Sequence, residues 1–336
     1  QDHIFVVELD DDNNPHASRV FRAADGISVK APDFAALFGK RLQVFGRHIL
    51  VSEVGPSNTV NVRLYDPLTG QDEWKQSYPS RSIVARSEDP HFTAVIDPEG
   101  KVHVIDLRAR KEVMTGQMVV SGGENHLRNV QGIHLLSDRK NFYLACQAPM
   151  QVNNGNPFGG VPVSNVMTNL GMRTVPVNGR LYVFERATGE VSWHAEAKNQ
   201  MLVLDQFREL PVVLLTSRHM TMPPGRGQQW TASVLSIEKW SGRVLFPDTD
   251  NLQNATNFFG VRVDARASTI DFLSPNVKIT HYPGPRKADK VVKPGAETSV
   301  PQAPEAKPRT PIGGRLKRST IDRVRIREIA DPLPVR

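Results

Sequence analysis

The chain of 336 residues is short of cysteine and of long hydrophobic runs. Its one cysteine, Cys146, excludes an internal disulfide, a CxxC redox pair and cysteine-rich zinc modules. No stretch approaches 18 uninterrupted apolar residues, so we expect no transmembrane segment. The first residue is Gln1 rather than Met, so we expect that a leader has been removed or that the chain belongs to a longer polypeptide.

Familiar catalytic motifs are also missing. The sequence has no HExxH zinc motif, no GxSxG nucleophile elbow, no phosphate-binding Walker loop and no GxGxxG after a strand. The ten histidines are scattered, and His103 and His134 lie within strand patterns. We therefore assign no catalytic, cofactor-binding or metal-binding residue.

The basic character of the chain is confined to its C-terminal end. The formal net charge is +7, but residues 281–336 hold 13 of the 42 Lys and Arg and 6 of the 35 Asp and Glu. Residues 1–280 are therefore neutral, and nucleic-acid binding is not expected. The same segment holds 9 of the 25 prolines, which break helices and sheet ladders. We interpret 283–336 as a Pro-rich basic linker and tail, which could contact a partner or an anionic surface.

Residues 40–282 contain a repeated unit. Four segments, Leu64–Trp74, Val104–Met114, Val183–Trp193 and Ser236–Phe246, share one pattern. An acidic residue is followed eight positions later by a large apolar residue, and in three segments a Thr/Ser-Gly pair lies between them. The pattern residues are Asp66, Thr69, Gly70, Trp74, Asp106, Met114, Glu185, Thr188, Gly189, Trp193, Glu238, Ser241, Gly242 and Phe246.

This pattern predicts a β-hairpin. The acid can accept backbone N–H bonds at the turn, and Gly supplies the positive φ that closes it. The returning strand then carries the large apolar residue, which we expect to pack against the next repeat. Two further short strands precede each hairpin, for example Ser82–Arg86 and His91–Ile96 before the second. Four strands in about 40 residues indicate a β-propeller blade.

We count four clear blades, at about 40–76, 80–117, 128–196 and 200–248. A degenerate fifth follows, and the fragment His3–Leu9 precedes them. The fold prediction is all-β: a propeller of four-stranded antiparallel blades over 1–282, followed by the tail. Since closed propellers usually have six to eight blades, we expect further blades upstream in a longer precursor or from another subunit.

Two long insertions fall at the same place in their blades, between the second and third strands. They cover about 148–178 and 218–229 and would emerge on one face. Long loops of this kind are often functional, so we interpret them as a partner-binding face. The candidate residues are Asn153, Asn154, Phe158, Met167, Met172, His219, Met222 and Arg226.

The acid, Thr-Gly and Trp of Tyr65–Trp74 and Phe184–Trp193 resemble the repeat of the pyrroloquinoline-quinone-type propeller superfamily. That superfamily includes quinoprotein alcohol dehydrogenases and the non-enzymatic outer-membrane assembly lipoprotein. Gly179–His194 and Asn199–Val212 look like the C-terminal part of large planctomycete proteins with such repeats. The resemblance implies a place in the cell envelope or periplasm.

The dehydrogenases of this superfamily hold their quinone with calcium and typically have two adjacent cysteines beside it, which one cysteine cannot supply. The preferred hypothesis is therefore a non-catalytic envelope scaffold without a cofactor, whose partners are other proteins of an assembly or the upstream part of the same precursor. The alternatives are a quinone-dependent oxidoreductase domain, with pyrroloquinoline quinone and calcium, and a subunit that contributes blades to a shared ring.

Overall fold

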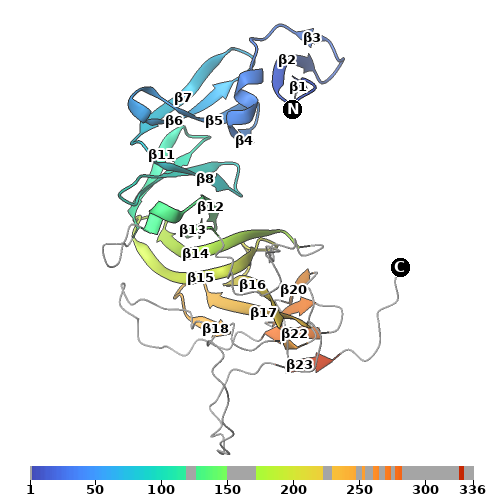
Figure 1. The fold of residues 1–336 in the computed structure, drawn as a ribbon, viewed down its shortest axis with the longest axis vertical. Helices are drawn as coiled ribbons and strands as arrows, with labels where there is room; N and C mark the ends of the chain where they lie inside the picture. The colour runs from blue at the N-terminus through green and yellow to red at the C-terminus, as the bar shows by residue number, and fades with distance from the viewer. Residues whose placement is uncertain are drawn as a thin grey trace, which may run out of the picture. The chain divides into compact units, whose positions relative to one another are not determined.

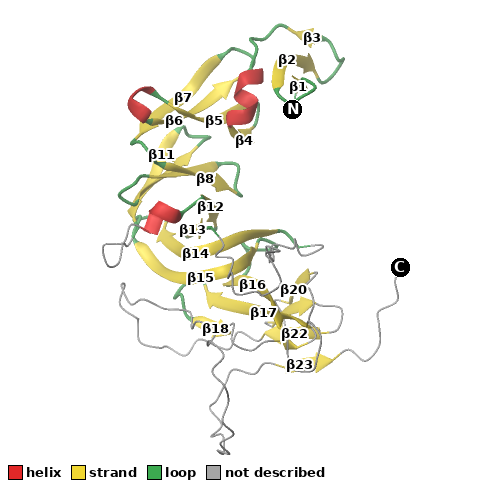
Figure 2. Cartoon of the chain, in the orientation of Figure 1, coloured by secondary structure: helices red, strands yellow, loops and turns green. Residues whose placement is uncertain are grey.

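The computed structural model describes residues 2–118, 126–149, 172–221, 229–246, 252–253, 260–264, 269–273, 277–281 and 325–328. These residues form strands almost throughout, as the yellow arrows in Figure 2 show. The helical parts within these ranges are short 3₁₀ turns at Ala35–Lys40, Pro56–Asn58 and His126–Asn129. The all-β prediction is confirmed. Among the described residues, no helix is long and apolar enough to cross a membrane.

The chain divides into two compact units. The first comprises residues 1–148 together with 182–191, and the second comprises 149–181 together with 192–336. Each unit is described by itself below.

The first unit begins with a small antiparallel sheet of β1 (His3–Leu9), β2 (Pro15–Arg22) and β3 (Ser28–Val29). Phe5, Val7 and Val29 of this sheet pack with the buried residues Val20 and Phe34. The sequence pattern predicted the first of these strands only.

Two repeats of four antiparallel strands follow (Figure 1). The first forms a sheet of its own, and the second lies at one end of a larger sheet. Repeat 1 consists of β4 (Arg41–Phe45), β5 (His48–Val54), β6 (Val60–Asp66) and β7 (Gln71–Tyr78). Repeat 2 consists of β8 (Ile83–Ser87), β9 (Phe92–Ile96), β10 (Lys101–Asp106) and β11 (Lys111–Gln117). Each strand pairs antiparallel with the next along the chain. The predicted four-strand repeat is confirmed for residues 41–117.

The next two strands of the first unit are β12 (Gly132–Ser137) and β13 (Asn141–Gln147), which form an antiparallel pair. β12 also pairs in parallel with β8 through His134↔Arg86 and Leu135↔Ser87. The first strands of two successive repeats thus run side by side in the same direction. Their apolar side chains, with Phe142, Leu144 and Phe184, form one buried cluster with those of repeat 2.

The third hairpin is formed by β14 (Thr174–Glu185) and β15 (Val191–Val203). β15 corrects one predicted boundary: the last strand of the third repeat and the first strand of the fourth, which the sequence pattern separated, are a single strand. The link between them, His194–Gln200, contains neither Gly nor Pro to end a strand. Its one left-handed residue, Asn199 with φ 53°, lies inside the strand.

In the second unit, the end of β15 pairs with β16 (Val212–Thr221), which pairs with β17 (Gln229–Glu238), followed by β18 (Val244–Phe246). The pairing of β16 with β17 continues to Thr221↔Gln229, so the connection is shorter than the predicted loop 218–229. A short strand, β19 (Leu252–Gln253), also pairs with β17.

A second sheet of this unit contains β20 (Gly260–Asp264), β21 (Thr269–Leu273) and β22 (Val277–His281), which correspond to the degenerate fifth repeat. Its fourth strand, β23 (Arg325–Glu328), pairs antiparallel with β22 through Ile279↔Ile326. A short part of the segment assigned to the tail is therefore a sheet strand.

Candidate functional site

The repeat turns share one backbone geometry. Gly70, Gly189 and Gly242 have φ values of 72°, 75° and 71°. Each donates its N–H to the backbone oxygen of the acid four residues earlier, at 2.9, 2.8 and 2.9 Å. In repeat 2 the same position is Arg110, which has φ 54°. A non-glycine residue in this region is strained by roughly 1–2 kcal/mol.

The acids stabilise these turns in two ways. Asp66 and Asp106 have short side chains that accept backbone N–H bonds, from Leu68 at 3.0 Å and from Arg108 at 2.8 Å. The longer Glu185 and Glu238 instead accept a hydroxyl, as in the 2.6 Å bond from Ser241 to Glu238. The hydroxyl oxygens of Thr188 and Ser241 in turn accept the backbone N–H two residues later, at 3.2 Å.

Each described apolar residue of the pattern contacts the turn of the following repeat. Trp74 packs in a cluster with Leu107. Met114 lies beside Gly189, where an added Cβ would come 3.5 Å from its Cγ and would collide with the Thr115 carbonyl.

The third contact of this kind, Trp193 with the last turn, lies entirely within the second unit. Trp193 donates its indole N–H to the Lys239 carbonyl at 2.7 Å, and a Cβ on Gly242 would come 2.7 Å from its ring. The side chain of Phe246 is outside the description. The pattern residues thus join each repeat to the next and do not converge on one pocket.

The loop residues have separate outcomes. Asn153, Asn154, Phe158, Met167, Met222 and Arg226 lie outside the described residues. Met172 lies just before β14 with 6% of its surface exposed, so it packs inside the second unit. His219 is part of β16, opposite Thr231. Cys146 is buried on β13.

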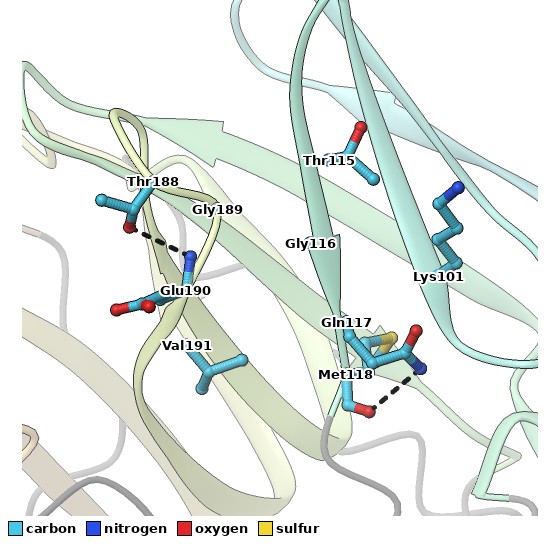
Figure 3. A pocket seen from close by; sticks show the side chains of 9 residues that line it. All are labelled: Lys101, Thr115, Gly116, Gln117, Met118, Thr188, Gly189, Glu190 and Val191. Carbon is cyan, nitrogen blue, oxygen red and sulfur yellow. Dashed lines mark hydrogen bonds between the residues drawn. The ribbon is translucent and has the colours of Figure 1, made fainter.

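A shallow groove of about 550 Å³ opens in the first unit, next to β11 (Figure 3). One side of the groove is formed by Thr115–Gln117 of β11 and by Met118, which follows it, with Lys101 of β10 beside them. The other side is Thr188–Val191 of the β14–β15 turn. β11 is the end strand of its sheet, so within the described residues no strand pairs with its outer edge. Lys101 and Glu190 are the titratable residues of the lining. The sequence analysis did not predict this groove, because the groove is formed by two different hairpins.

A cluster of possible metal-binding side chains lies at one end of repeat 1. Potential ligand atoms of His48, Asp66 and Glu73 are within 4.8 Å of one another. Arg47 contacts Asp66 Oδ2 at 2.7 Å, and Arg110 pairs with Glu73. Burial lowers the pKa of His48; Asp66 opposes this shift and Arg47 adds to it. The sequence pattern predicted a role for Asp66 in its turn only and gave no role to His48 or Glu73.

Two histidines that the sequence placed in strands are also found there. His103 of β10 lies 2.6 Å from Glu112 through its Nδ1. His134 of β12 is buried, and burial, followed by the charge of Arg86, lowers its pKa. Neither belongs to the groove lining.

No protein-family model and no curated protein matches the chain. Among solved structures it is similar to BamB from Moraxella catarrhalis, with 14% identity over 82% of this chain and 72% of that one, and a TM-score of 0.34. The designed Ika8 protein gives 9% identity, 82% and 80% coverage and a TM-score of 0.32. A quinohemoprotein alcohol dehydrogenase from Pseudomonas putida HK5 gives 12% identity and a TM-score of 0.37, and the match covers 84% of this chain and 56% of that one. Similarities at this level leave the function to be argued from the residues of this chain.

Proposed function

We propose that the chain is part of a non-catalytic β-propeller of the cell envelope and acts as a scaffold that binds an extended segment of another protein. The groove beside β11 is the observation that carries this proposal. Its volume, about 550 Å³, lies within the range of roughly 300–1,000 Å³ typical of ligand clefts.

The groove suits a polypeptide better than a small apolar molecule. A strand edge without a strand partner offers backbone N–H and C=O groups to an added strand. On β11 the Thr115 carbonyl lies against Gly189, so the added strand would pair with the rest of this edge. The lining adds the hydroxyls of Thr115 and Thr188, the amide of Gln117, and one charge of each sign. Such a surface binds through backbone and polar contacts. Among the described residues, the acid–base side chains of the lining are Lys101 and Glu190, and it has no His, Cys or Asp.

The remaining structure supports a rigid scaffold. The repeated pattern of acid, glycine and large apolar residue serves the turns and the contacts between repeats. We place the partner-binding face at this groove. The tail segment 283–336 stays a candidate contact with a partner or an anionic surface.

Site-specific photo-crosslinking in the source cell tests the proposal. A photo-reactive residue at Glu190, which is exposed and lines the groove, should give one discrete adduct with another protein. The matched control is Ala187, an exposed residue of the same turn that does not line the groove. Equal adducts at both positions, or none at either, would contradict a partner site in the groove.

A further inference from the structure

The cluster of His48, Asp66 and Glu73 has a geometry that the turn pattern does not explain. His48 begins β5, Asp66 ends β6 and Glu73 lies on β7, so three adjacent strands bring these side chains to one end of repeat 1. The β6–β7 ladder pairs Leu64 with Trp74 and Tyr65 with Asp72, which leaves Glu73 as the extra residue of a β-bulge. Bulges redirect a side chain, and this one brings Glu73 to His48.

Among the described residues, His48 Nε2 is buried and has no hydrogen-bond partner. A neutral imidazole with its proton on Nδ1 has a lone pair on Nε2, and this is the form that binds metals.

Nε2 lies 3.0 Å from Glu73 Oε1, in an orientation that makes no hydrogen bond. These two potential ligand atoms have nearly the spacing of two ligands that bind one cation. Two ligands of a tetrahedral zinc ion, each about 2.0–2.1 Å from the metal, lie about 3.3 Å apart.

We propose that His48 Nε2, Glu73 and Asp66 bind a divalent first-row transition metal such as zinc. One imidazole and two carboxylates provide three ligands for such an ion, and water completes the coordination. Since the three residues lie on β5, β6 and β7, the ion fastens the end of repeat 1.

Arg47 sets the affinity of this site. Without metal its guanidinium neutralises Asp66 at 2.7 Å, and about half of its side chain is exposed, so it can turn toward solvent when an ion binds. Arg110 neutralises Glu73 in a similar way and is equally exposed. Removing the positive charge of Arg47 should therefore tighten metal binding by at least about fivefold.

Titration calorimetry of the full chain with zinc chloride tests the proposal. The wild-type chain should show one saturable site that weakens at least tenfold in His48→Gln and in Glu73→Gln and tightens in Arg47→Gln. Calcium chloride should give no such site, because calcium prefers an all-oxygen shell. The matched control is His103→Gln, which removes a histidine paired with one carboxylate, Glu112, and should leave zinc binding unchanged.

Circular dichroism of each variant separates loss of metal from loss of fold. Should His48→Gln fail to fold, Glu73→Gln and the increase in Arg47→Gln still decide the question. A wild-type chain that binds no zinc at micromolar concentration overturns the proposal. So do His48→Gln and Glu73→Gln variants that fold and bind zinc as the wild type does.

Discussion

The second and third repeats close the same turn by different means. In the third, Gly189 takes up the left-handed conformation without strain and fits closely against Thr115. In the second, Arg110 occupies this conformation, and charged groups surround the hairpin: Arg110 pairs with Glu73, and Glu112 contacts His103 and Thr115. The difference shows that the pattern fixes a backbone shape, which either glycine or side-chain contacts can support.

The largest expected effect comes from the indole that joins the third repeat to the fourth. Trp193→Ala removes a buried side chain and its bond to Lys239, so the free energy of unfolding should fall by about 3–5 kcal/mol. Trp193→Phe should lose only about 1–2 kcal/mol, mainly from the lost indole hydrogen bond. Denaturant unfolding measures both. Equal losses for the two variants would show that the hydrogen bond, rather than the packing, dominates this contact.

Gly189→Ala should cause the next largest loss in the free energy of unfolding. The new Cβ adds left-handed strain of roughly 1–2 kcal/mol and collides with the Thr115 carbonyl, for a total of about 2–4 kcal/mol. Gly46→Ala is the control, because Gly46 has φ 59° and open space around it. It should lose only about 1 kcal/mol. A loss in Gly189→Ala no greater than in Gly46→Ala would show that the close fit against repeat 2 is unimportant.

Low pH should destabilise repeat 2 because it protonates Glu112. Burial raises the pKa of Glu112, but hydrogen bonds from Thr115 and His103 outweigh it, so the net shift is downward from 4.5. The stabilisation is therefore present above about pH 4.5 and is lost as the pH falls through the lowered pKa. Glu112→Gln should reduce stability at pH 7, and its difference from the wild type should shrink below pH 4.5. Unfolding curves of the wild type and of Glu112→Gln at several pH values measure this difference.

Arg110→Gly should have the smallest effect. It relieves strain of roughly 1–2 kcal/mol but removes a half-exposed ion pair worth about 0–1 kcal/mol. Glycine also loses about 0.5–1 kcal/mol more in backbone entropy on folding, so the net stabilisation should be about 1 kcal/mol or less. Arg110→Ala loses the ion pair and keeps the strain, so it should be the less stable variant. The reverse order would mean that the ion pair with Glu73 holds the turn.

The hairpins could be predicted because their signals are local. Acid, glycine and large apolar residue lie within nine positions, and each residue acts on its own turn or on the next one. The β-bulge at Glu73 could not be predicted from the sequence, because it depends on how two strands pair. The continuity of β15 was missed because the third and fourth repeats share this strand without a turn residue between them.

The candidate sites were harder to predict than the hairpins. The groove combines an edge strand of one hairpin with the turn of another, and the metal cluster joins three strands. Neither leaves a motif in the sequence. Met172, which lies within a predicted loop, is buried because apolar residues near a strand end can pack inward. Loop length alone did not distinguish an exposed loop residue from a buried one such as Met172.

Native mass spectrometry of the protein isolated from its source, together with an absorbance scan for quinone, tests the central claim most directly. The scaffold account predicts a quinone-free species bound to another polypeptide, with binding reduced by Glu190→Lys in the groove and retained by the neighbouring Ala187→Ser. Stoichiometric quinone with calcium would contradict it and establish a quinone-dependent oxidoreductase domain instead.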